Sequence, residues 1–188
     1  MKRLAMLTAM ALGLAICNAA LAEKIKLRLQ GFQETPSTLS SPAFAEFEAT
    51  ISSHDDSIAW EMTYAGFPTD VLQSHIHFGQ RALTGGISIF LCTNLANAPA
   101  APAAPTQACP TPAGTISGLI TSNEVIGPTA QGIAPGELAE ILAAIRAGYA
   151  YVNIHTKAFP GGEIRAQFKR NNGHHHHDHD DDHGHDKH

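Results

Sequence analysis

Alternation of apolar and polar residues runs through most of the chain and constrains its fold most strongly. It begins with KIKLRL at residues 24–29, where apolar and basic positions strictly alternate. Successive side chains of a strand point to opposite faces, so this pattern predicts a strand with one buried face. Similar segments follow: FAEFEATI, SIAWEMTYA, VLQSHIHF, GGISIFLC, GTISGLIT, YAYVNIHT and GGEIRAQFK. Short strands separated by turn residues predict an all-β, antiparallel sandwich or barrel.

One segment has a helical period instead. PGELAEILAAIRAG places apolar residues at i, i+3, i+4 and i+7, namely Leu138, Ile141, Leu142 and Ile145. The pattern predicts one short helix before the last two strands, ending near Gly148. We interpret its apolar face as a cover for the core rather than as a binding surface.

Residues 1–22 have the pattern of a secretory signal peptide. A basic start, MKR, precedes an apolar run over residues 4–16 and an A-x-A site that predicts cleavage after Ala22. The run is shorter than the roughly 20 residues that span a bilayer. Ile16 stands before Cys17 where a lipoprotein signal needs a small residue. We therefore expect a soluble, exported protein without a membrane span, periplasmic or extracellular.

The charge of the chain argues against nucleic acid as a partner. The formal charge of −5 becomes −7 without Lys2 and Arg3, and residues 174–188 contribute −4 of it through five Asp and one Lys. Residues 23–173 then carry −3 and have the length of one domain with its own core. Nucleic-acid binding needs a basic excess that this chain lacks.

Two cysteines remain after the predicted cleavage, Cys92 and Cys109. An even pair in an oxidising compartment predicts a disulfide, which would close the Ala/Pro-rich loop TNLANAPAAPAAPTQA. A thiolate metal site is the alternative. The spacing between Cys92 and Cys109 is much longer than the spacing in the C-x₂₋₄-C pairs of thiolate metal sites, so we favour the disulfide.

Residues 174–188 have no aliphatic side chain and are expected to be a disordered metal-capturing tail. The histidine run breaks after four and continues as a His/Asp mixture, so we interpret it as native rather than as a purification tag. Its candidate ligands are His174, His175, His176, His177, His179, His183, His185 and His188.

A His-x-His pair lies in the predicted strand VLQSHIHF. His75 and His77 share one face of the strand, and Ile76 and Phe78 face the core on the other side. Imidazoles at this spacing can converge on one ion at about 2.0–2.1 Å per bond. Taken alone, the pair also fits a polar sheet face.

A third histidine, His155, lies on the polar side of the strand YAYVNIHT. If this strand pairs with the one that carries His75, three imidazoles meet at a surface site. Asn153 and Glu163 are then candidate partners that orient an imidazole. Arg165 could steer an anion to the metal, or it could simply pair with Glu163.

The segments LQGFQETP, SHIHFG, GTISGLIT and ELAEILAAIRAGYAYVNIHTKAFPGGEIRAQF resemble the CHRD domain, a family named after chordin, over roughly residues 25–169. The resemblance implies an immunoglobulin-like or superoxide-dismutase-like antiparallel sandwich. The family's His-x-His and Asn-x-His-Thr elements match His75, His77 and His155. Ala166, the Cys92–Cys109 loop and the tail depart from the family pattern, but no candidate ligand is lost. The family has no single agreed activity.

Three neutral imidazoles without a thiolate favour copper, then zinc. Because an imidazole binds metal only when deprotonated, capture should weaken below about pH 6. Two alternatives remain. The histidine-bearing face could form a homodimer or bind a protein partner without chemistry. The chain could also be a copper redox enzyme like copper-zinc superoxide dismutase. No histidine lies between residues 78 and 155, where that enzyme has its zinc loop, so we favour a non-enzymatic role.

Overall fold

The computed structural model describes residues 21–99 and 106–171. The described residues form the strands β1 (Glu23–Gln30), β2 (Phe44–Ile51), β3 (Ile58–Ala65), β4 (Val71–Phe78), β5 (Gly86–Thr93), β6 (Gly114–Ile120), β7 (Ala150–Thr156) and β8 (Ile164–Gln167). They also form the helix α1 (Leu138–Ala147) and the 3-10 turns η1 (Gly31–Gln33), η2 (Ser122–Glu124) and η3 (Thr129–Gln131). Each strand expected from alternation is present, and so is the helix.

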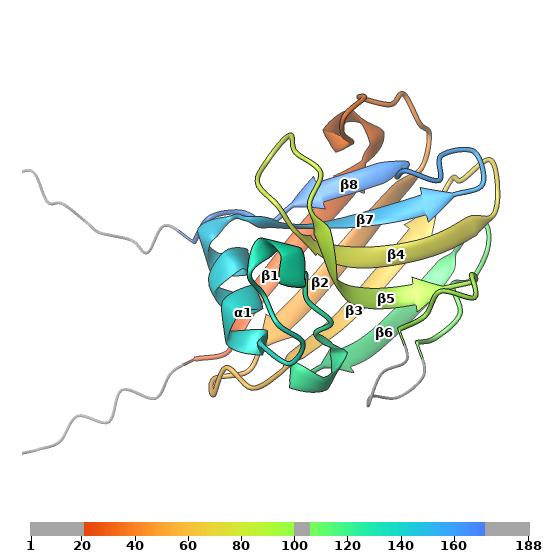
Figure 1. Ribbon diagram of the computed structural model, residues 1–188. Coiled ribbons are helices and arrows are strands. Elements are labelled where there is room, and N and C mark those ends of the chain that lie inside the picture. Colours follow the sequence, from red (N-terminus) through yellow and green to blue (C-terminus); the bar gives the residue numbers. More distant parts are fainter. Residues whose placement is uncertain (1–20, 100–105, 172–188) are drawn as a thin grey trace, which may run out of the picture.

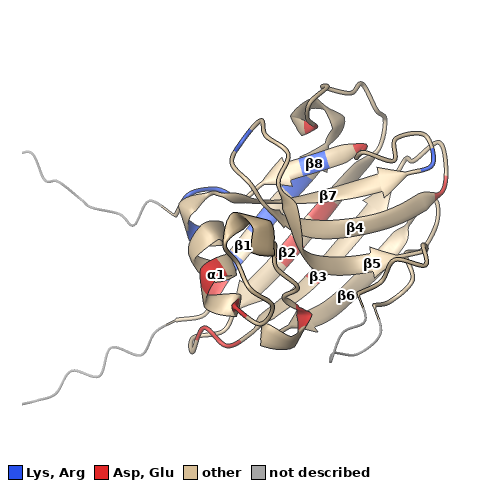
Figure 2. Ribbon diagram, in the orientation of Figure 1, with Lys and Arg blue, Asp and Glu red and all other residues tan. Residues whose placement is uncertain are grey.

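The strands form one antiparallel sheet in the order β5-β4-β7-β8-β1-β2-β3-β6. β8 and β1 are joined by a single residue pair, Arg165 and Gln30. The sheet turns at this narrow junction, so that β5-β4-β7-β8 form one layer and β1-β2-β3-β6 a second layer behind it (Figure 1). The all-β antiparallel sandwich predicted from the sequence is confirmed. β8 and the neighbouring β1 both contain Lys or Arg residues (Figure 2).

Apolar side chains of both layers fill the space between them. β2 shows the expected alternation, with buried Phe47 and Ile51 on one face and exposed Glu46 and Glu48 on the other. Opposite them, β7 contributes Val152 and Ile154. Helix α1 closes one end of the sandwich with the predicted face of Leu138, Ile141, Leu142 and Ile145, and Gly148 ends it with a left-handed φ of 77°.

The outer face of the β4-β7-β8 layer differs from the outer face of β1 and β2, because loops cover it. All of β7 and most of β4 are buried on both faces. Arg165 donates to Thr35 Oγ1 after η1 and to the carbonyls of Gln80 and Leu83 in the β4–β5 loop. Gln167 Nε2 donates to the carbonyl of Gly79 in the same loop. These contacts enclose the polar face of the layer.

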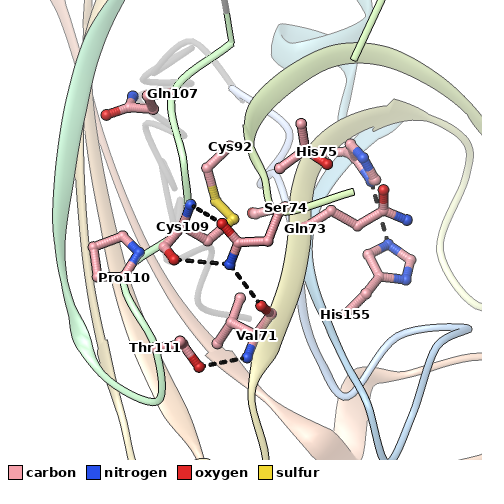
Figure 3. Close-up of a disulfide and its surroundings, with 12 residues drawn as sticks. Val71, Gln73, Ser74, His75, Cys92, Gln107, Cys109, Pro110, Thr111 and His155 are labelled. Carbon is pink, nitrogen blue, oxygen red and sulfur yellow. Dashed lines mark hydrogen bonds between the residues drawn. A yellow bond between two sulfur atoms is a disulfide. The ribbon is translucent and has the colours of Figure 1, made fainter. Parts of the chain in front are cut away.

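Cys92 at the end of β5 and Cys109 before β6 form the predicted disulfide. Nearby, the Asn94 side chain donates to the carbonyls of Val71 and Cys109 and accepts from the Cys109 amide. Figure 3 shows the disulfide beside Val71 of β4. The bridge and this amide therefore connect β4 and β5 of one layer to the segment that leads into β6 of the other.

Removing this disulfide in a Cys92→Ala/Cys109→Ala variant is expected to lower the free energy of unfolding by about 3 kcal/mol, because the unfolded chain regains the entropy of the closed loop. Urea denaturation of the variant and the oxidised parent measures the difference. Unchanged stability would show that Asn94 and the strands alone hold the connection.

The expected signal peptide, apart from Leu21 and Ala22, and the expected tail of residues 174–188 lie outside the described residues. None of the helices in the described ranges has the length and apolar character that a bilayer crossing requires.

Candidate metal centre

The pairing of β4 with β7 brings the three predicted histidines together. In the register of these strands, His75 lies opposite Asn153, Gln73 opposite His155 and His77 opposite Tyr151. His75 therefore lies diagonally across from His155, with ring centroids 5.0 Å apart, and His77 lies two residues further along β4, with its ring 6.2 Å from that of His155. One ring nitrogen from each of the three histidines lies within 4.8 Å of the others. Figure 3 shows His75 and His155 facing each other from adjacent strands. The strand adjacency that the sequence left open is thus established.

The site is buried, so the expectation of a surface site is wrong. His75 is 0% exposed, His77 6% and His155 7%. All three point away from the apolar core, as alternation predicts, but the loops over this layer exclude solvent from them. The face that carries them is covered by the chain's own loops. The histidines therefore cannot form the exposed polar strip that a dimer or partner interface through them would need.

Backbone carbonyls fix the orientation of two imidazoles. His77 Nδ1 lies 2.9 Å from the Gly85 carbonyl, and His155 Nδ1 lies 2.9 Å from the Pro160 carbonyl. A carbonyl can only accept, so Nδ1–H is the donor in both rings, and in the neutral ring Nε2 then carries a free lone pair. Both Nε2 atoms are thereby prepared to act as ligands, and a hydrogen bond from the opposite nitrogen is the usual support of a metal-bound histidine.

One of the distances between the nitrogens suits a small metal ion, and all three nitrogens lie within 4.8 Å of one another. His75 Nδ1 lies 3.3 Å from His155 Nε2. Two nitrogens at about 2.0–2.1 Å from one ion in tetrahedral geometry lie roughly 3.3 Å apart. The Nε2 atoms of His75 and His77 are buried and have no hydrogen-bond partner in the described structure. Buried polar atoms without partners are costly, so the orphaned lone pair of His77 Nε2 fits a site that binds an ion; in His75 the nitrogen that faces His155 is Nδ1, and the orphaned Nε2 is the other ring nitrogen.

Burial keeps the imidazoles neutral. It lowers the pKa of His75 to about 2, helped by the neighbouring His155 and His77, and it lowers the pKa of His77 to about 4. Burial also lowers the pKa of His155. Because metal ions bind the neutral ring, the three side chains are ready for an ion at pH 7 without losing a proton first. The expected weakening of capture below about pH 6 therefore applies to ordinary, exposed imidazoles.

An aromatic and cationic stack supports His77. Its ring lies parallel to that of Tyr151, with centroids 4.7 Å apart, and the Arg165 guanidinium lies 3.4 Å from the centroid of the Tyr151 ring. Tyr151 Oη accepts from the Gly85 amide, the residue whose carbonyl binds His77. A Cβ at Gly85 would lie 1.9 Å from the carbonyl oxygen of Phe78, so only glycine allows the loop to approach this closely.

Asn153 and Glu163, the two residues predicted to orient an imidazole, make different contacts in the structure. The Asn153 side-chain amide lies 3.1 Å from His155 Nε2, the nitrogen assigned as a ligand, whereas the opposite nitrogen, Nδ1, is held by the Pro160 carbonyl. The Glu163 carboxylate instead accepts hydrogen bonds from the hydroxyls of Ser41 and Thr156.

Arg165 does not pair with Glu163. It is 2% exposed, and its guanidinium donates to the loop carbonyls, to Thr35 and to Gln167 Oε1. A steering role for an incoming anion requires an exposed charge, so that expectation is corrected. Arg165 instead holds the loops over the site.

Glu34 is a charged group in this region that the sequence reasoning missed. It is 5% exposed, and its Oε1 has no hydrogen-bond partner among the described residues. Its carboxylate lies against Gly162, where an added Cβ would be 2.8 Å from Oε2. Burial raises the pKa of Glu34 to about 7, and Arg165 and Asn153 oppose this only partly. The motif GFQETP contains the residue, but its polar, turn-like composition gives no signal of burial.

A Glu34→Gln variant should therefore be more stable than the parent at alkaline pH. A carboxyl whose folded pKa is raised contributes its full stability below the unfolded value and loses it as pH rises through about 7. Glutamine keeps the shape without the charge, so we expect a gain of roughly 1–3 kcal/mol at pH 8 that vanishes near pH 4.5. Urea denaturation at both pH values measures it, with exposed Glu61→Gln as the control. A loss of stability at pH 8 would contradict a buried, uncompensated charge.

The fold and the three-histidine cluster define a class of protein: a single β-sandwich domain that encloses three neutral histidines between two adjacent strands and the loops over them. The family model of the CHRD domain matches residues 25–168, and the chain belongs to the CHRD domain family. No curated protein and no solved structure matches the chain.

Proposed function

We propose that the protein is an exported metal-binding protein that holds one copper ion, or zinc as the second choice, through His75, His77 and His155. The observation that carries this proposal is the group of three buried imidazoles whose ligand nitrogens lie within 4.8 Å of one another. Two of those rings are fixed by backbone carbonyls in the tautomer that frees Nε2.

The protein's own residues do three things at the site. The carbonyls of Gly85 and Pro160 keep Nδ1 of His77 and His155 protonated. His75 donates from Nδ1 to His155 Nε2, and it must move this proton to its own Nε2 if Nδ1 is to bind. Arg165 holds the β4–β5 loop in place and so excludes water. A bound ion would supply Lewis acidity and, for copper, one-electron redox chemistry.

Copper is proposed ahead of zinc on ligand chemistry. A site of nitrogen ligands binds Cu²⁺ more strongly than Zn²⁺ in the Irving–Williams order. The paired cysteines form a disulfide with each other, so thiolates do not enter the ligand set. The disulfide is also consistent with the oxidising compartment to which the leader-like residues 1–22 would direct the chain.

The His/Asp-rich tail would act as a collector in this proposal. Its eight histidines and five aspartates can bind ions with little selectivity, while the pocket offers fixed geometry. Exposed tail imidazoles release metal as they protonate near their ordinary pKa of about 6.5. The pocket rings stay neutral to lower pH because their pKa values are lowered. An ion would therefore pass from the tail to the pocket as pH falls through 6.

Metal analysis of a chain limited to residues 23–173 tests the proposal, because it removes the tail that would bind ions by itself. After equilibration with Cu²⁺ or Zn²⁺ at pH 7 and gel filtration, we expect one ion per chain and preference for copper in direct competition. A chain that retains neither metal would leave the three-histidine pocket without the proposed function.

A further inference from the structure

The basic residues of the domain are concentrated in one region. Residues 23–173 contain nine Lys and Arg against twelve Asp and Glu. Six of the nine line two adjoining grooves beside the β1–β8 junction: Lys24, Lys26, Arg28, Arg81, Lys169 and Arg170. Of these six, Lys26 forms ion pairs with Glu48 and Glu46. Of the remaining three, Arg146 and Lys157 form ion pairs with acidic residues, and Arg165 is buried. An acidic domain thus carries one basic region (Figure 2).

The grooves are open and form one continuous path. The larger has a volume of about 450 Å³ and shares Lys26 and Lys169 with the smaller, which extends to Asn171. Only two acidic residues line them, Glu46 and Glu23, and Arg146 already binds Glu23. The grooves therefore hold an excess of positive charge although the domain as a whole is negative.

The chain itself supplies an anion at this place. Asn171, which lines the smaller groove, is the last described residue, and the segment that follows carries a formal charge of −4 over residues 174–188. We propose that the His/Asp-rich tail, residues 174–188, docks in the basic groove along the β1–β8 junction. The docking is argued from charge and position alone and does not depend on metal binding in the histidine pocket.

Because the tail is covalently attached next to the grooves, it is favoured over free anions as the ligand of the grooves. A flexible chain of the length that follows Asn171 has an end-to-end distance of roughly 20–25 Å, enough to follow a groove that starts beside its origin. Attachment keeps the effective concentration of the tail in the millimolar range. Elsewhere the negative domain repels the tail, so attraction is confined to the grooves.

Docking would place the tail beside the loops that cover the histidine pocket. The large groove shares Gln33, Arg81 and Gln167 with a third groove, which is lined by Glu34 and Arg165. Each divalent ion adds two positive charges to the tail, so two ions cancel its −4 and weaken docking. Binding of metal ions by the tail would therefore release the tail from the groove.

Zero-length carbodiimide coupling on the full, metal-free chain at pH 7 tests the proposal, because it joins carboxylates to amines that touch. Lys26 and Lys157 serve as probes of similar exposure, 66% and 63%. Lys26 already faces two carboxylates, Glu48 and Glu46, and Lys157 faces one, Asp70, so prior pairing does not favour coupling at Lys26. We expect peptides of the tail coupled to Lys26 but not to Lys157, within monomers. An Arg28→Gln/Arg81→Gln variant, which keeps Lys26, should lower this coupling about fivefold, the effect of two exposed ion pairs.

High salt and Zn²⁺ complete the test. Coupling of the tail to Lys26 should fall in 0.5 M NaCl and after addition of two equivalents of Zn²⁺. Equal coupling of Lys26 and Lys157 would overturn the proposal and assign the groove to an anionic partner outside the chain. Coupling found only between two chains would overturn it in favour of a second copy as the occupant.

Discussion

Replacing His75, His77 and His155 together by alanine is expected to abolish metal retention by residues 23–173, and replacing one of them should weaken binding several hundredfold. Four-ligand zinc sites bind with about 10–16 kcal/mol, or about 3–4 kcal/mol for each ligand. The nitrogens of the three rings converge within 4.8 Å, so each ring has a comparable share. Competition titration with a chromophoric chelator measures the dissociation constant.

His54 provides the matched control for this series. It is the other histidine of the domain and is exposed in the turn between β2 and β3. His54→Ala should leave the dissociation constant unchanged. If the triple variant binds as tightly as the parent, the ion lies elsewhere, and the convergence of the three rings serves only the packing of β4 against β7.

The variant His75→Phe distinguishes the contribution of His75 to metal binding from its contribution to the stability of the metal-free protein. The ring of His75 is buried and its Nε2 has no partner, so an apolar ring of similar size should leave the metal-free protein equally stable or about 1 kcal/mol more stable. Thermal unfolding with and without Zn²⁺ should show that the variant loses the stabilisation by metal. A strongly destabilised metal-free variant would indicate that the imidazole is there for packing.

Acid is expected to destabilise the metal-free protein already above the pKa range of its exposed carboxylates. The unfolded chain protonates its histidines near pH 6.5, whereas burial lowers the folded pKa of His77 to about 4 and that of His75 to about 2. The unfolded state therefore binds more protons between pH 6.5 and 4, and stability falls as pH falls. Each neutral imidazole costs about 3 kcal/mol at pH 4.

Glu34 opposes this trend. Its raised pKa of about 7 makes the folded state bind one proton more than the unfolded state between pH 7 and 4.5. It offsets the loss of stability from about one imidazole. His75 and His77 lose about 3 kcal/mol each, so the net loss from these groups between pH 7 and 4 should be roughly 3 kcal/mol, and the lowered pKa of His155 acts in the same direction. Such a loss is a large fraction of the stability of an ordinary domain.

Urea denaturation at several pH values between 7 and 4 measures this slope. His77→Phe keeps an aromatic ring against Tyr151 and should reduce the slope by one proton, while His54→Ala should leave it unchanged. A slope that is identical in His77→Phe and the parent would mean that His77 is protonated in the folded protein, and the neutral pocket would be refuted.

The sequence predicted the elements and the faces well, because alternation depends on neighbouring residues alone. It placed His75 and His77 opposite Ile76, and it placed His155 and Asn153 opposite Val152 and Ile154. The disulfide followed from cysteine number and compartment. The pairing of β4 with β7 depends on contacts that are distant in the chain, and only the structure established it.

Burial of the polar face was not predictable, because it depends on loops. The carbonyls of Gln80 and Leu83 bind Arg165, and the carbonyls of Gly85 and Pro160 bind the histidines. Carbonyl contacts of this kind leave no pattern of side chains in the sequence. The same holds for Glu34, which lies in a polar turn and is nonetheless enclosed.

A crystal structure of residues 23–173 soaked with Cu²⁺ or Zn²⁺, with anomalous scattering recorded at the metal edge, tests metal binding by the pocket most directly. We predict one anomalous peak at about 2.0–2.1 Å from Nε2 of His77, Nε2 of His155 and one ring nitrogen of His75. A pocket without a peak after soaking, or a peak held only by surface carboxylates, would contradict the assignment of the three histidines as ligands.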